Sequence, residues 1–250
     1  MAKNGTLKYI VYGIIACFFA GLTMGITAFG FALVALPLLI LFLDPKTAVP
    51  IVTISSTLTG IYLFWGLRKI MQVKKIIPLI LGGITGLPFG VYILAVLDKD
   101  ILKISVGTLI IIFAVFLALG IKREIKSEKY ASILVGMVSG LLKGCTSLSG
   151  PPLVLFFINQ DHEKEVFRAN LTGYFLIMGT LAVIALAIGN LVSLSVLEYS
   201  AWFVVPTIFG TWLGSKISPR VNPVPFRNLS LAVVIIAGIL SVLSGLEVFG

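Results

Sequence analysis

The chain has 250 residues, of which 58% are hydrophobic and 12% charged, and its formal net charge is +9. Soluble domains carry about a quarter charged residues, so this composition excludes an ordinary soluble domain. The apolar residues gather in long blocks, unlike the alternating segments of about ten residues that build a membrane β-barrel. We therefore predict an all-α polytopic membrane protein, with 1–250 forming a single transmembrane domain.

The basic residues lie mostly in short loops between the apolar blocks, as the positive-inside rule describes. The positive charge therefore indicates membrane topology, and we predict no nucleic-acid partner. Clusters of proline, glycine, asparagine, aspartate and charged residues separate the blocks. In chain order, the apolar blocks lie at about 9–27, 30–43, 47–66, 76–97, 101–120, 131–146, 150–160, 168–189, 199–216 and 226–246.

The first two blocks form one apolar stretch from Tyr9 to Leu43. A continuous helix of roughly 35 residues would measure about 52 Å, whereas the hydrocarbon core of a bilayer is about 30 Å thick. Glycines and threonines interrupt the stretch at GLTMGITAFG, residues 21–30. We predict a broken or re-entrant helix pair here.

The two halves of the chain share short matching segments in the same order. AGLTMGIT at 20–27 matches SGLLKGCT at 139–146, LTGIYLF at 58–64 matches LTGYFLI at 171–177, and PLILGGITG at 78–86 matches PTIFGTWLG at 206–214. These matches predict two related repeats of about five hydrophobic segments each. Repeat one spans about 9–120 and repeat two about 131–249, and each opens with a broken or re-entrant helix pair.

The charges of the loops predict that the repeats are inverted. Loops 67–75, 121–130 and 216–227 are basic, whereas Glu198 is the only charged residue of loop 190–198. If the basic loops are cytoplasmic and loop 190–198 is external, each repeat crosses the membrane an odd number of times. The N-terminus is then external, although it carries Lys3 and Lys8.

The second repeat has its own break in GLLKGCTSLSGPPLVLF, residues 140–156. The two prolines at 151–152 predict that one helix ends and another begins there. Non-helical backbone at membrane depth must be buried in protein or line a wet cavity, and the positive end of the second half-helix favours an anion. We expect 21–30 to shape a cavity and 143–152 to hold the anion.

Candidate substrate-binding residues come from both breaks. They are Lys143, Gly144, Cys145, Thr146, Ser147, Ser149 and Gly150 in the second break, and Gly25, Thr27 and Gly30 in the first. The alternative function of the glycine pairs is close helix packing.

Lys143 stands out because it is the only charged side chain in the apolar stretch 131–160. Its position about a dozen residues past the loop indicates a charge near the midplane and hence an anion partner. The alternative is a lysine that snorkels toward a shallow cavity. Cys145 is either a soft contact for a sulfur oxyanion or a buried filler.

Arg168 and Asn170 open the block at 168–189 and align with Ser55 and Thr57 of the first repeat. We predict that Arg168 is a gate for anions, with an interfacial anchor as the alternative. Thr57 and Asn170 are predicted substrate contacts. The alternative for the polar patch at 55–57 is hydrogen bonding between helices.

Each half opens with a G-x-x-x-G motif and a cluster of small residues before an apolar run, and carries a later Gly-x3-Gly segment before a basic loop. In these motifs the whole chain resembles the TauE/SafE sulfite-exporter family of membrane permeases. The family's dense break, GGG-x-x-x-x-P, is here thinned to GITAFGFALVALP and altered to GCTSLSGPPLVLF. The resemblance implies a carrier that moves small sulfur anions, such as sulfite or sulfoacetate, across the cytoplasmic membrane.

We therefore predict a secondary transporter of small anions that works by alternating access around a midplane site. The alternatives are an anion channel and the membrane substrate-binding subunit of a larger importer. An enzyme is not predicted, because the only histidine, His162, lies in a charged loop and no H-E-x-x-H motif occurs. We predict no cofactor and no metal; membrane lipid and a small anion are the partners, with protons a candidate coupling ion.

Overall fold

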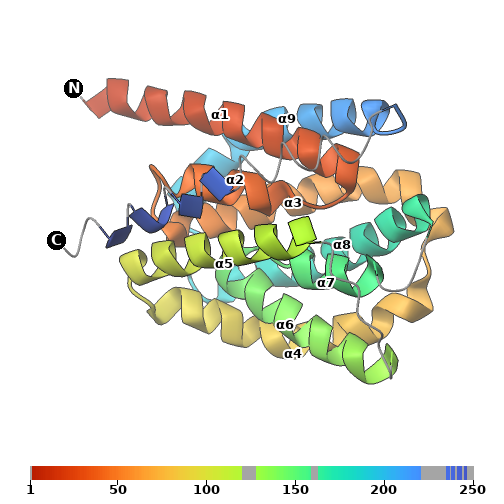
Figure 1. Cartoon of the computed structure of the whole chain (residues 1–250). Coiled ribbons are helices and arrows are strands. Elements are labelled where there is room, and N and C mark those ends of the chain that lie inside the picture. The colour runs from red at the N-terminus through yellow and green to blue at the C-terminus, as the bar shows by residue number, and fades with distance from the viewer. Residues whose placement is uncertain are drawn as a thin grey trace.

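The computed structural model describes residues 2–119, 128–158 and 163–220, and parts of 235–246, and these residues form helices and turns without a strand. The long helices lie side by side in a bundle (Figure 1). Their bounds are α1 Ala2–Thr27, α2 Phe31–Leu39, α3 Pro45–Leu67, η1 Arg68–Ile70, α4 Val73–Val96, α5 Lys99–Leu119, α6 Glu128–Thr146, α7 Gly150–Ile158, α8 Lys164–Ile188 and α9 Leu194–Ile217. The prediction of an all-helical protein is confirmed.

The predicted blocks and the observed helices differ mainly at their ends. α8 and α9 begin several residues before the blocks at 168–189 and 199–216. The first turn of α8 begins with Lys164 and Glu165, so an apolar pattern misses it. α2 ends at Leu39 rather than at 43, and a turn follows. α3 then begins with Asp44 as its N-cap, whose carboxylate accepts a hydrogen bond of 2.8 Å from the amide of Lys46.

Several parts of the sequence-based predictions lie outside the described residues. These include His162 and most of loops 121–130 and 216–227. Of the last apolar block, only some residues of 235–246 are described, and they are helical.

The described helices suit a membrane in length and in surface. Those long and apolar enough to cross are Tyr9–Thr27, Pro45–Ile70, Val73–Val96 and Lys164–Ile188. Large apolar side chains also face outward, among them Phe89, Tyr92 and Trp202. Such an apolar surface is stable against lipid chains rather than against water.

Glycines bring helices of the two halves into backbone contact. A Cβ on Gly21 of α1 would lie 2.3 Å from the carbonyl oxygen of Thr207 in α9, and one on Gly82 of α4 would lie 2.0 Å from that of Ile133 in α6. α1 and α9 are therefore close neighbours, as are α4 and α6 (Figure 1). Gly21 and Gly82 therefore allow close helix packing, which was the alternative function given for the glycine pairs.

The same contacts give the directions of the helices. Gly25, one turn beyond Gly21, meets Thr211 in α9, so α1 and α9 run parallel. The contacts of α4 also advance along α6 in the same order, so α4 and α6 are parallel too.

Contacts at one end of the bundle relate these two pairs to each other. Arg168 in the first turns of α8 donates to the carbonyl of Gly25 near the end of α1, and Asn170 accepts from the amide of Gln72 just before α4. α1 and α9 therefore end where α4, α6 and α8 begin, and we call this the Arg168 end. It follows that α1 runs opposite to α6, and α4 opposite to α9.

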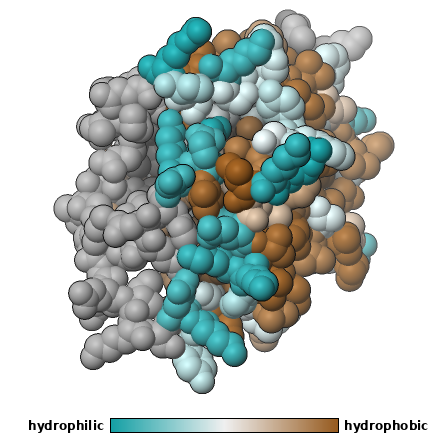
Figure 2. Space-filling view, turned by 90° about the vertical axis from the view of Figure 1, so that its right-hand side faces the viewer, coloured by the Kyte–Doolittle hydropathy of each residue, from teal (hydrophilic) through white to brown (hydrophobic). Residues whose placement is uncertain are grey.

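Figure 2 looks onto the end of the bundle drawn on the right of Figure 1, where α3 turns through η1 into α4. Hydrophilic side chains gather on it, and apolar side chains border them on one flank. This division is the one expected of a bundle whose ends meet water and whose sides meet lipid.

Candidate functional site

The chain leaves helical geometry after α1 and again after α6. Ala28 has φ of 63° and Ser147 has φ of 60°, a left-handed conformation that is uncommon for residues other than glycine. The next helix starts at Phe31 in the first half and at Gly150 in the second. A break therefore lies within each predicted stretch, but it is shorter than predicted. Only residues 28–30 and 147–149 leave the helix, whereas Gly21, Gly25 and Lys143 lie inside α1 and α6. The two breaks share the same backbone turn.

Threonine hydroxyls hold both turns in place. Thr27 Oγ1 accepts a hydrogen bond of 3.2 Å from the amide of Phe29, and Thr146 Oγ1 accepts one of 3.3 Å from the amide of Leu148. Each hydroxyl also donates to the carbonyl four residues earlier in its own helix. Both threonines, predicted as substrate contacts, therefore use their hydroxyls on the backbone of the break.

A small cavity lies between the two breaks. It offers about 40 Å³ to the centres of water-sized molecules, which is room for about three waters or a small oxyanion. Its lining comes from both halves of the chain: Met24, Phe29, Gly30, Phe31, Ala32, Leu33, Ser56, Lys143, Ser147, Leu148, Ser149, Gly150, Pro151 and Phe175.

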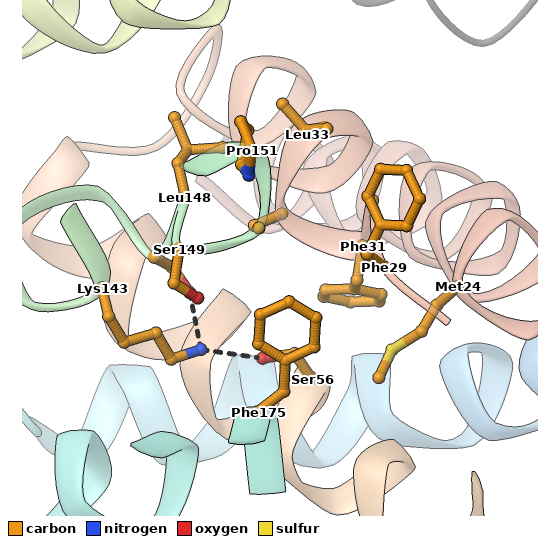
Figure 3. A pocket seen from close by; sticks show the side chains of 14 residues that line it. Met24, Phe29, Phe31, Leu33, Ser56, Lys143, Leu148, Ser149, Pro151 and Phe175 are labelled. Atoms are coloured by element: carbon orange, nitrogen blue, oxygen red, sulfur yellow. Dashed lines mark hydrogen bonds between the residues drawn. The ribbon is translucent and has the colours of Figure 1, made fainter. Parts of the chain in front are cut away.

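Lys143 is the only charged side chain among the residues that line this cavity (Figure 3). It is 4% exposed, so it does not snorkel to the surface. Its Nζ donates to Ser147 Oγ at 3.3 Å and to Ser56 Oγ at 3.5 Å. No carboxylate in the described part of the chain lies within ion-pair distance of it. An ammonium buried without a counter-charge attracts an anion into the cavity.

The serine and threonine hydroxyls near Lys143 form a short chain. Thr53 Oγ1 in α3 donates to Ser147 Oγ at 3.1 Å, and Ser147 accepts from Lys143 as well. Ser139 in α6 donates to the carbonyl of Ser149 at 2.9 Å, which holds the turn before α7 against α6. The hydroxyls thereby fix the position of the ammonium without neutralising it.

Ser56 lies in the cavity, whereas the predicted contact Thr57 does not. Thr57 donates instead to the carbonyl of Thr53, and it packs where α3 meets Gly179 of α8. The helical period gives no signal that separates the two, because Ser56 and Thr57 both lie about one turn from Thr53 on α3.

The structure brings some of the predicted site residues together and separates others. Those lining the cavity are Gly30, Lys143, Ser147, Ser149 and Gly150. Those outside the lining are Gly25, Thr27, Thr57, Gly144, Cys145, Thr146, Arg168 and Asn170. Of these, Gly25 and Gly144 contact the backbones of α9 and α4, and the Cys145 thiol points to its own helix carbonyl at Leu142. No group of three histidine, cysteine or acidic side chains suited to a metal occurs in the described ranges.

Arg168 is also buried, at 7% exposed, but its charge is satisfied. Its Nη1 lies 3.1 Å from both carboxylate oxygens of Glu165, and its Nη2 donates to the carbonyl of Gly25 at 2.9 Å. Next to it, Ser218 Oγ donates to the carbonyl of Ile26. These bonds tie α8 and α9 to the last turn of α1, directly before the first break.

Comparison with known proteins identifies the family of this chain. The family model described as "Sulfite exporter TauE/SafE" matches residues 13–241. A relative in Bacillus subtilis, named "Probable membrane transporter protein YjnA", is 21% identical over 88% of this chain and 95% of its own length. One in Cupriavidus necator, named "Probable sulfite/organosulfonate exporter TauE", is 26% identical over 57% of this chain and 59% of its own length. No solved structure matches.

Proposed function

Because this chain belongs to the TauE/SafE sulfite-exporter family, whose members are membrane transporters, we propose that it is a secondary carrier of small sulfur oxyanions. The substrate site is the cavity between the two breaks. The observation that carries the proposal is Lys143, a buried ammonium in that cavity whose only hydrogen-bond partners among the described residues are neutral hydroxyls.

The chemistry of the cavity suits an oxyanion. Lys143 supplies a positive charge, and Ser147 supplies a hydroxyl donor beside it. Ser56 accepts from Lys143 and donates its own proton to the carbonyl of Thr53, so it orients the ammonium. Phe29 and Phe175 add apolar walls, which suit the organic part of a sulfonate. The substrate class follows from the family and from the Cupriavidus relative, whose name gives sulfite and organosulfonates.

An inverted repeat supports a carrier mechanism. Repeat one at about 9–120 and repeat two at about 131–249 supply the matched breaks, and their corresponding helices α1 and α6 run in opposite directions. In such folds, two conformations of similar energy expose one central site to opposite sides of the membrane. Alternating access around Lys143 is therefore the proposed mechanism. Arg168 is the proposed gate between the cavity and the Arg168 end of the bundle.

We assign the Arg168 end to the cytoplasm. Arg68 and Lys69 of η1 lie there, as do Lys164 at the start of α8 and Lys216 and Arg220 at the end of α9. This distribution agrees with the positive-inside rule.

The test is transport by the purified protein in proteoliposomes. We expect uptake of sulfite or of a small organosulfonate to saturate, and preloaded unlabelled substrate to accelerate uptake of the labelled substrate, as a carrier requires. Flux that neither saturates nor exchanges indicates the channel alternative. If sulfite, thiosulfate, sulfoacetate and simple carboxylates all move no faster than in protein-free vesicles, with and without a pH gradient, the proposal fails.

A matched pair of lysine variants tests the site itself. Lys143→Gln keeps a side chain of similar length without the charge, and Lys129→Gln removes an exposed lysine from the first turns of the same helix. We expect Lys143→Gln to lose transport and Lys129→Gln to retain it. Equal transport by both variants would place the substrate elsewhere.

A further inference from the structure

The two half-helices present different chemical groups to the cavity. The first turn of α2 is Phe31, Ala32 and Leu33, all of which line the cavity and carry an amide N–H. The first turn of α7 is Gly150 followed by two prolines, and proline has no amide hydrogen. The positive end of this half-helix was expected to favour an anion, but two of the first three residues of α7 have no N–H group to donate.

The amides at the start of α2 have no acceptor within the described residues. The N-cap is Gly30, which has no side chain to cap the helix, and the first helical hydrogen bond runs from the amide of Val34 to the carbonyl of Gly30 at 3.1 Å. The three preceding amide groups are left without a partner. Phe31 and Leu33 are buried residues and Ala32 is partly buried, and unpaired amides away from bulk water are costly unless a ligand or water accepts from them.

Lys143 is a second, independent observation that points to an anion in the same place. It comes from α6 in the other half of the chain and lines the same cavity as the start of α2. It is almost wholly buried and has no described counter-ion. The partial positive charge at the N-terminus of α2 adds to this field, so an anion between the two satisfies both.

We propose that the backbone amides of Phe31, Ala32 and Leu33 bind the oxygen atoms of the transported oxyanion, and that Lys143 neutralises its charge. This inference rests on the proposed function and specifies its site. It adds the first turn of α2, directly after residues 21–30, to the binding groups, which were expected only from 143–152. The start of α2 supplies the backbone donors, and α6 with the second break supplies the cation and the serine hydroxyls.

The test removes one backbone donor at the cavity and, in a control, one outside it. Ala32→Pro deletes a proposed donor at the second residue of α2, in the first turn, where proline is compatible with a helix. Ser195→Pro is the matched control, since it places proline at the second residue of α9, in an exposed turn outside the cavity lining. We expect Ala32→Pro to raise the apparent KM for sulfite about tenfold or more, because a hydrogen bond to a charged group is lost. Ser195→Pro should leave the KM within about twofold of that of the parent.

The outcomes separate this inference from the proposed function. If the parent moves sulfite, Lys143→Gln does not, and a folded Ala32→Pro variant keeps the parent KM, the α2 amides are rejected and the proposed function stands. If the parent moves no tested anion, both proposals fail. A raised KM in Ala32→Pro, with an unchanged melting temperature, supports the amide site.

A direct measurement covers the case in which Ala32→Pro does not fold. Parent protein with selectively labelled Phe–Ala peptide groups gives an NMR signal for the amide of Ala32, which is assigned with Ala32→Gly. We expect sulfite to shift this signal in the parent protein and not in Lys143→Gln. A signal that saturating sulfite leaves unmoved in a transport-competent parent overturns the inference.

Discussion

Lys143 and Arg168 are both buried cations of the second half of the chain, but only one of them is neutralised by its surroundings. Arg168 meets a carboxylate and a helix-end carbonyl, whereas the described partners of Lys143 are hydroxyls that carry no charge. A charge in an apolar block therefore becomes a binding group only where the fold provides no counter-ion for it. Arg168 joins helices, and Lys143 faces a cavity.

The largest expected effect is that of Lys143→Gln on transport. The substrate loses its only cationic partner in the cavity, so we expect kcat/KM for sulfite to fall about 30-fold or more, which corresponds to about 2 kcal/mol. Without substrate, the variant melts at the same temperature as the parent or higher, because a buried charge without a counter-ion has been removed. Proteoliposome uptake and thermal unfolding in detergent measure the two effects. If Lys143→Gln melts at a much lower temperature than the parent and still transports sulfite, Lys143 stabilises the fold and does not bind the substrate.

Arg168→Gln comes next, and here we expect stability to change more than substrate affinity. The substitution leaves the carbonyl of Gly25 and the carboxylate of Glu165 without their donor, so unfolding becomes easier by about 1–3 kcal/mol. Thermal unfolding measures the loss, and the KM for sulfite reports on the cavity. If stability is unchanged and the KM rises as far as in Lys143→Gln, Arg168 belongs to the binding site instead.

Ser56→Ala is expected to have a moderate effect on transport. It removes a neutral hydroxyl beside Lys143, so the KM for sulfite should rise about threefold to tenfold, equivalent to about 0.5–1.5 kcal/mol. Its matched control is Thr57→Ser, next in the chain but outside the cavity, which should leave the KM unchanged. If Thr57→Ser raises the KM more than Ser56→Ala does, Thr57 is the substrate contact, as the sequence analysis predicted.

Glu165→Gln should have the smallest effect. The Glu165 side chain is 51% exposed, so water weakens its ion pair with Arg168 and its removal should change stability by about 0.5 kcal/mol or less. Arg168 keeps its hydrogen bond to Gly25 in this variant. A loss as large as that of Arg168→Gln would show that the ion pair, and not the helix-end carbonyl, is what Arg168 contributes.

Much of the fold could be predicted from the sequence because lipid imposes long apolar helices. The helices therefore follow the apolar blocks, and glycine, threonine and proline mark the breaks after Thr27 and Thr146. The start of α8 was predicted less accurately. Its first turn is polar, so a search for apolar residues places the start of the helix too late, although the backbone there is already helical.

The candidate site was predicted in part. Lys143 was found because a lysine in an apolar block is costly, and Ser147 and Ser149 because they lie in the break beside it. Ser56 was missed in favour of its neighbour, since a one-residue step turns a helical side chain by about 100° and only the packed bundle shows which face of α3 meets the cavity. The repeats and their inversion stay predictions that the helix directions support.

Three properties follow from the amino-acid sequence alone: the helical membrane class, the approximate positions of both breaks and the presence of a cation near the second. These depend on local chemistry: apolar length, backbone freedom and the cost of an intramembrane charge. The packed bundle, in contrast, sets which cation has a counter-ion and which half-helix offers its amides to the cavity. Both depend on contacts between α1, α3, α6 and α8, and the rotation of these helices about their axes comes from packing along the whole bundle.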